Sequence, residues 1–132
     1  MEGAAARSAW EFLRNMDQVC ERLAKRNIVL RSVHADWGLF GCWVIEASNG
    51  EDEEARGAAI RAGEYDAAGP EFLRVVWDGR DGVLTAERGR DPTVTTGGGR
   101  PDPIVPRAEF SSSKEALAAA EELLVEHLAD WA

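Results

Sequence analysis

Histidine and cysteine are scarce in this chain, with two of each among 132 residues. They are His34, His127, Cys20 and Cys42, and no pair has the close spacing of a metal site or of a CxxC redox motif. The GxSxG turn that presents a nucleophilic serine is also absent. We therefore expect no catalytic residues, no metal and no cofactor. Both cysteines fall within apolar patterns, which favours two core thiols over a disulfide.

Long apolar runs are lacking as well. None approaches the roughly 18 residues of a membrane span, and residues 1–7 lack the basic-then-apolar order of a secretion signal. These absences predict a cytoplasmic protein that does not associate with membranes.

Basic residues are outnumbered, 15 against 24 acidic ones, which leaves a net charge of −9. A surface of this sign repels phosphate backbones, so direct binding of nucleic acid is disfavoured. The same charge accelerates encounter with a basic partner, although acidity of this degree is also common in proteins that need it only for solubility.

The length and the 45% hydrophobic content fit a single domain over residues 1–132. We expect residues 1–7 to be disordered and residues 90–107, which hold four of the five prolines, to form a loop. The Gly97-Gly98-Gly99-Arg100 segment lacks the Lys-Ser/Thr pair of a phosphate-binding loop, so we interpret it as a flexible loop.

Two hairpins organise the middle of the chain. Apolar runs at residues 72–77 and 83–87 flank a loop with two glycines and two aspartates, which predicts one β-hairpin. Runs at 28–35 and 39–47 predict another, and alternation in the second run suggests a central strand covered on both faces. Residues 55–64 are too short a pattern to separate strand from helix, and we favour an edge strand.

Amphipathic helices are predicted at both ends. Ser8 and Glu11 have the capping-box form, Asn27 suits a left-handed helix end, and Ser112 with Glu115 repeats the box. The expected core faces are Phe12, Met16, Val19 and Leu23, and Leu117, Ala120, Leu124 and Leu128. The fold class is therefore α+β: an antiparallel sheet of four to five strands, built from the two hairpins, packed against an N-terminal and a C-terminal helix.

Five tryptophans and one acidic run suggest where a partner binds. We assign Trp43, Trp77 and Trp131 to the core, and Trp10 and Trp37 are candidates for exposed anchors. Trp37 can also pack back over the sheet end. Four consecutive acids form a surface run. The predicted partner-binding residues are Asp36, Trp37, Glu51, Asp52, Glu53 and Glu54.

The last third of the chain combines Pro103 to Pro106, a Ser112-Ser113-Lys114-Glu115-Ala116 helix start and a terminal Trp131. In this it resembles the small immunity proteins that neutralise bacterial polymorphic toxins. The resemblance implies a non-enzymatic inhibitor that binds one toxin domain and occludes its active site. An acidic surface is compatible with the basic cleft of a toxin that attacks nucleic acid.

Two alternatives remain open. The size and acidity also resemble those of type III secretion chaperones, which would imply a homodimer that binds an effector segment. A small-molecule-binding domain or an enzyme would need a pocket of about 300 Å³ or more with convergent polar groups. The chain is thus expected to be a monomer or a homodimer with a protein partner.

Overall fold

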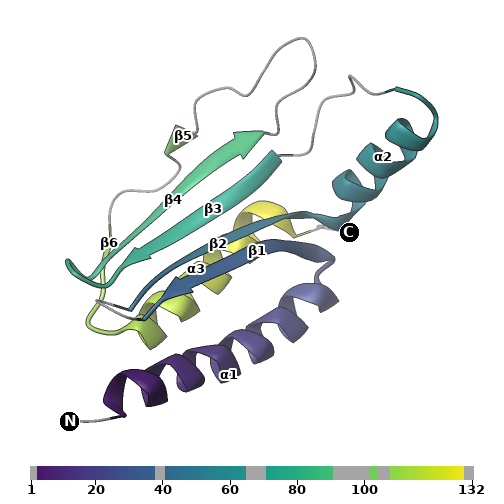
Figure 1. Ribbon diagram of the computed structural model, residues 1–132. Coiled ribbons are helices and arrows are strands. Elements are labelled where there is room, and N and C mark those ends of the chain that lie inside the picture. The colour runs from purple at the N-terminus through teal and green to yellow at the C-terminus, as the bar shows by residue number, and fades with distance from the viewer. Residues whose placement is uncertain (1–2, 38–40, 65–70, 91–101, 104–107, 130–132) are drawn as a thin grey trace.

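The computed structural model describes residues 3–37, 41–64, 71–90, 102–103 and 108–129. Three helices and six strands follow in the order α1 (Ala4–Lys25), β1 (Ile28–Asp36), β2 (Cys42–Asn49), α2 (Gly50–Arg61), β3 (Glu71–Asp78), β4 (Val83–Arg90), β5 (Asp102–Pro103), β6 (Ala108–Glu109) and α3 (Ser113–Leu128). The predicted α+β class, with its antiparallel sheet and terminal helices, is confirmed (Figure 1). Within the described residues, no helix combines the length and hydropathy that a membrane span requires.

The sheet has the order β1-β2-β3-β4-β5, with β6 also paired to β4. All pairings are antiparallel, and both predicted hairpins are present as β1–β2 and β3–β4. Strand β2 is central, as expected, because it pairs with β1 and β3. The register places Trp43 opposite Trp77 and Ile45 opposite Val75, so these four side chains share one face.

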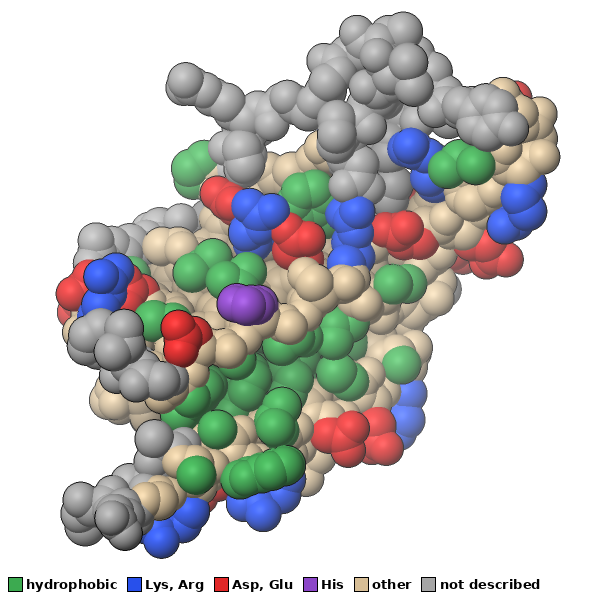
Figure 2. Space-filling model, viewed as in Figure 1, with side chains coloured by type: hydrophobic (Ala, Val, Ile, Leu, Met, Phe, Trp, Pro, Cys, Tyr) green, Lys and Arg blue, Asp and Glu red, His purple; other side chains and the backbone are tan. Residues whose placement is uncertain are grey.

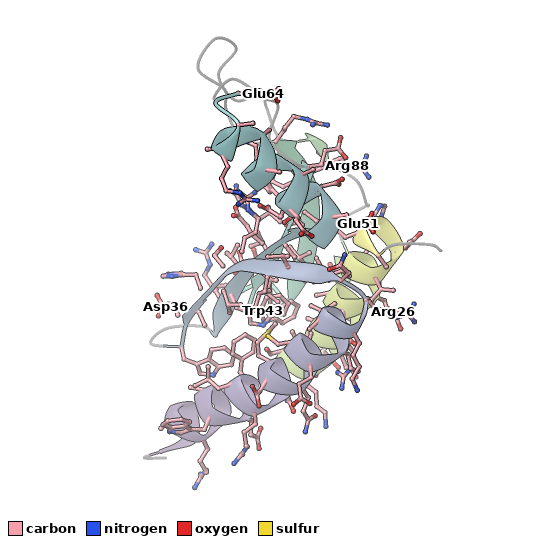
Figure 3. All side chains as sticks on the ribbon, turned by 90° about the vertical axis from the view of Figure 1, so that its right-hand side faces the viewer. Arg26, Asp36, Trp43, Glu51, Glu64 and Arg88 are labelled. Atoms are coloured by element: carbon pink, nitrogen blue, oxygen red, sulfur yellow. The ribbon has the colours of Figure 1, made fainter. Side chains whose placement is uncertain are left out.

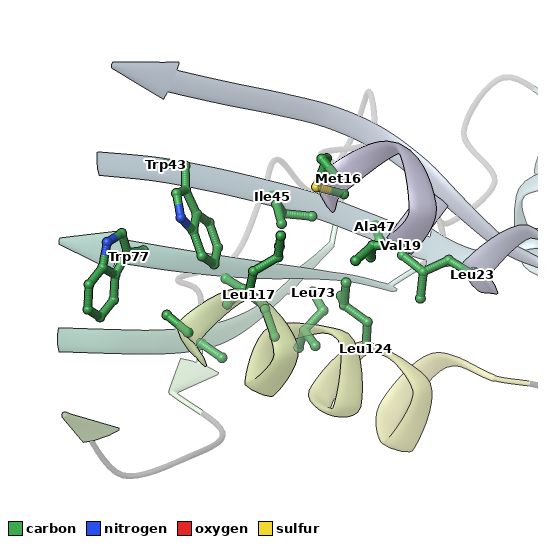
Figure 4. Packing of buried hydrophobic residues seen from close by; sticks show 14 of the residues in the cluster. Met16, Val19, Leu23, Trp43, Ile45, Ala47, Leu73, Trp77, Leu117 and Leu124 are labelled. Atoms are coloured by element: carbon green, nitrogen blue, oxygen red, sulfur yellow. The ribbon is translucent and has the colours of Figure 1, made fainter. Parts of the chain in front are cut away.

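The core lies between that face and the two terminal helices (Figure 4). Alternate residues of β2 and β3 meet the predicted helix faces, because strand side chains repeat every two residues and helix side chains every three or four. All predicted core positions of α1 and α3 are buried, together with Trp43 and Trp77. Trp131, the third tryptophan assigned to the core, lies outside the described residues.

The opposite face of the sheet confirms one expectation only in part. We predicted that both faces of β2 are covered. On the outer face Ser48 is fully buried and donates to Glu53 of α2, whereas Val44 and Glu46 are half-buried because no terminal helix packs there. Arg74 of β3 instead bridges two acids across the strands, donating to Glu46 and, over 3.1 Å, to Glu87. These bonds raise the pKa of the Arg74 guanidinium.

Phe72 lies on this outer face opposite Gly89, which leaves room for its ring. A Cβ at position 89 would lie 2.6 Å from Phe72 Cζ. We expect Gly89→Val to lower the free energy of unfolding by about 1–3 kcal/mol, because the ring must shift. Urea unfolding measures the loss, and Phe72→Ala in the same chain should remove most of it. An equal loss in both backgrounds would contradict this contact.

The first helix begins earlier than predicted. It starts at Ala4 after Gly3, which adopts a left-handed φ of 83°, so Ser8 lies inside the helix and does not cap it. Ala4 to Arg7 are therefore helical, contrary to the expected disorder, because alanine-rich sequence extends a helix at little free-energy cost. The predicted end is confirmed, since Asn27 has a left-handed φ of 57°.

The predicted edge strand at residues 55–64 is wrong. Residues 50–61 form helix α2, which begins where the sequence suggested a turn. Asn49 accepts a hydrogen bond at its side chain from the Asp52 amide over 3.1 Å, and three acids occupy the first turn. The N-cap and the favourable interaction of these acids with the helix dipole explain why a helix forms here.

The start of α3 is confirmed in outline. Ser112 Oγ accepts from the Glu115 amide, whereas the Glu115 carboxylate accepts from Ser111 and not from Ser112. Most of the expected 90–107 loop lies outside the described residues, but Arg90 belongs to β4 and Asp102–Pro103 forms β5. Cys20 and Cys42 are free thiols and are half-buried.

Candidate binding site

The predicted acidic run forms the start of α2. Glu51, Asp52 and Glu54 are exposed, whereas Glu53 is half-buried and turned toward the sheet. Its carboxylate accepts from Ser48 Oγ over 2.6 Å and lies 3.5 Å from Arg31 Nε. Glu53 therefore holds α2 against the outer face of the sheet, and the other three acids are the ones a partner can reach.

Asp36 and Trp37 lie at the other end of the β1–β2 hairpin. Asp36 ends β1, and the half-buried Trp37 packs on Phe12 with 5.0 Å between ring centroids. The structure therefore does not bring the six predicted residues together: Asp36 is separated from Glu51 by the length of the hairpin (Figure 3). The two sets of residues nevertheless adjoin the same strand. Asp36 ends β1, and Glu53 of the acidic run forms an ion pair with Arg31 of β1.

Strand β1 is an edge of the sheet. Its only strand partner in the described part of the chain is β2, and residues 32–36 are all exposed. A β-bulge interrupts the pairing between Leu30 and Ser32. An edge strand presents unpaired backbone N–H and C=O groups, to which an extended chain can hydrogen-bond. The stretch Ser32–Asp36 is the accessible part of this edge.

Apolar side chains lie beside the same edge. Trp10 and Leu13 of α1 are 64% and 50% exposed, and Val33 of β1 is 36% exposed. Helix α1 and strand β1 meet at the turn that contains Asn27. With a rise of about 1.5 Å per helical residue and about 3.3 Å per strand residue, Leu13 and Val33 are each about 20 Å from this turn. The two residues therefore lie level with one another. We call these three residues the α1–β1 strip; Figure 2 shows hydrophobic side chains gathered in this region.

On another side of α1, a cleft of about 520 Å³ opens between the first turns of α1 and the start of α3. Phe12, Trp37, Trp77 and Leu117 contribute apolar walls. Polar groups line it as well, among them Glu11 and Asn15 of α1 and Ser112, Ser113 and Lys114 of α3. The cleft thus has the size and the convergent polar groups that small-molecule binding requires.

The groups with possible reactivity are dispersed. Burial, followed by the nearby Asp17 charge, raises the pKa of the Cys20 thiol, which keeps it protonated and a poor nucleophile. The His127 ring lies 3.3 Å from an Arg88 nitrogen, and His34 is exposed on β1. No cluster of three His, Cys, Asp or Glu residues suited to a metal ion occurs in the described ranges.

Sequence reasoning missed Leu13 and Val33 as binding candidates, although it identified Trp10. The signal in α1 was that Leu13 and Trp10 lie off the stripe of Phe12, Met16, Val19 and Leu23. For Val33 there was no signal, because its side chain is on the helix-covered face and is exposed only because β1 is an edge.

Comparison with protein-family models, with curated proteins and with solved structures finds no match.

Proposed function

We propose that this chain is a non-enzymatic binding protein that takes up a basic, extended segment of a partner protein along the open edge of β1. The observation that supports it best is the coincidence of an exposed strand edge with the α1–β1 strip. Main-chain hydrogen bonds to the edge would supply affinity, and side chains of the segment that point toward α1 would pack on the strip. The partner segment thus contacts the β1 edge and the α1–β1 strip at the same time.

Charge favours a basic occupant. Asp36 ends β1, Asp17 lies in α1 close to Cys20, and helix α2, which carries the exposed acids, meets β1 through the Glu53–Arg31 ion pair. A segment with apolar residues in its middle and lysine or arginine toward its ends would match this pattern. A second copy of the chain would bring another charge of −9 to the same surface, which disfavours a homodimer here.

The more specific proposal is that the partner is a toxin domain and that the chain inhibits it by occluding its active site. It rests on the resemblance to immunity proteins and on the acidic surface, which suits a basic catalytic cleft. Under this proposal the complex is tight and contains one copy of each chain. Inhibition of the partner's activity upon mixing would support it, and a fully active complex would exclude it.

Salt dependence tests the electrostatic part. We expect the association rate with the captured partner to fall at least about tenfold between about 0.05 and 0.5 M salt, because screening weakens long-range attraction between surface charges. The triple variant Glu51→Gln, Asp52→Asn, Glu54→Gln should flatten this dependence. Stopped-flow or biosensor kinetics measure both.

Glu122→Gln on the exposed side of α3 is the matched control for a lost surface charge and should leave the dependence nearly unchanged. An association rate of the unaltered protein that is indifferent to salt would contradict the role of the acidic residues in docking.

A further inference from the structure

The cleft between α1 and α3 is distinct from the α1–β1 strip, because it adjoins the side of α1 that carries Glu11 and Asn15. Three aromatic side chains line it: Phe12 and Trp77 are each 4% exposed, and the half-buried Trp37 packs on Phe12. The Phe12 ring already packs against Trp37 and Trp43, so Trp37 is the ring most accessible to a ligand, and it favours a flat apolar one because ring pairs contribute beyond their buried area.

Trp77 differs from Trp43 in what its indole N–H contacts. Trp43 Nε1 donates to Ser113 Oγ over 2.9 Å. Trp77 is 4% exposed and nearly as buried, yet among the described residues its indole N–H donates to no acceptor, and the nitrogen is not among the fully buried atoms. An indole N–H that solvent can reach is free to donate to a ligand. Because Trp77 lines the cleft, a ligand acceptor there would complete it.

Other hydrogen-bond donors line the cleft together with Trp77. Ser113 and Ser112 each accept one hydrogen bond at their hydroxyl oxygen, from Trp43 and from the Glu115 amide, so each retains a hydroxyl proton to donate. Lys114 adds an ammonium group at the cleft rim, and the start of α3 adds the positive end of the helix dipole. The α3 side therefore suits an acceptor-rich anion, whereas Glu11 on the α1 side repels one.

We propose that this cleft binds a small carboxylic acid with a flat aromatic body. The carboxylate lies toward Ser112, Ser113 and Lys114 and accepts from the Trp77 N–H, and the ring lies against Trp37. The volume of about 520 Å³ is within the range of small-molecule sites and exceeds what a two-ring acid needs. This proposal is independent of the β1 edge.

The test uses 2-naphthoate as the probe and 2-naphthamide as its neutral counterpart, with the full chain labelled for NMR. We expect naphthoate to bind with a Kd below about 1 mM, to shift the Trp77 indole N–H signal most among the assigned indoles, and to bind at least about fivefold more tightly than the amide. Lys114→Gln should weaken naphthoate binding about threefold to tenfold and leave amide binding unchanged.

Lys25→Gln is the matched control, because Lys25 is the other lysine of the chain and lies in the last turn of α1, away from the cleft. Trp77→Phe removes the indole N–H and tests its contribution to binding. Because Trp77 is in the core, this variant can fail to fold, and Lys114→Gln, which changes an exposed residue, then remains as the test. Equal binding of acid and amide, or binding that is insensitive to Lys114→Gln, would overturn the proposal. No binding at about 1 mM would do the same.

Discussion

Replacing Trp43 with alanine is expected to lower the free energy of unfolding by about 3–5 kcal/mol, the range for truncating a buried aromatic side chain. Trp43 is 1% exposed, lies 5.8 Å from the Phe12 ring centroid and donates to Ser113. Its removal leaves a cavity between the sheet and both terminal helices. Urea unfolding followed by far-UV circular dichroism measures the loss.

Trp10→Ala is the matched control, since it removes the same side chain from a site that is 64% exposed. We expect a change within about 0.5 kcal/mol, as for most surface substitutions. Similar losses for the two variants would mean that Trp43 is not the centre of the core.

The double variant Leu13→Glu, Val33→Glu is expected to weaken binding of the partner segment at least about a hundredfold, which corresponds to about 2.7 kcal/mol. Both side chains are exposed in the free protein, so the fold should persist, whereas the complex would have to bury two carboxylates against apolar groups. Biolayer interferometry with the captured partner measures the affinity.

Ile60→Glu provides the control, because Ile60 is 38% exposed on α2 and lies outside the α1–β1 strip. It should bind as the unaltered protein does. If Leu13→Glu, Val33→Glu binds normally while Ile60→Glu does not, the partner docks on α2. The naphthoate affinity should be unaffected by the first variant, which separates failure at the edge from failure at the cleft.

The hairpins and the terminal helices were predictable because their signals are local. Alternation along β3 and the stripe from Phe12 to Leu23 each depend on neighbours within a few residues, and the burial pattern follows them. Helix α2 was not predicted for two reasons. Gly57 and Gly63 flank the short apolar run at residues 58–62, and Asn49 is equally typical of a turn and of a helix N-cap.

The candidate site was less predictable because it depends on strand order. The sequence of β1 contains no signal that the strand lies at the edge of the sheet, and Val33 is exposed only because of this edge position. The acidic run was evident, but the inward turn of Glu53 follows from the placement of α2 over Ser48 and Arg31. The sequence allowed two interpretations of Trp37, an exposed anchor for a partner or a side chain packed over the sheet end. Its contact with Phe12 favours the second.

Hydrogen exchange of β1, with and without the partner, tests the central claim most directly. If a segment pairs with the open edge, alternate amides of Ser32–Asp36 acquire hydrogen bonds and should exchange at least about tenfold more slowly in the complex. The amides of β3, which lies inside the sheet, provide the internal reference. Unchanged exchange along Ser32–Asp36 in a saturated complex, with protection elsewhere on the surface, would contradict the account.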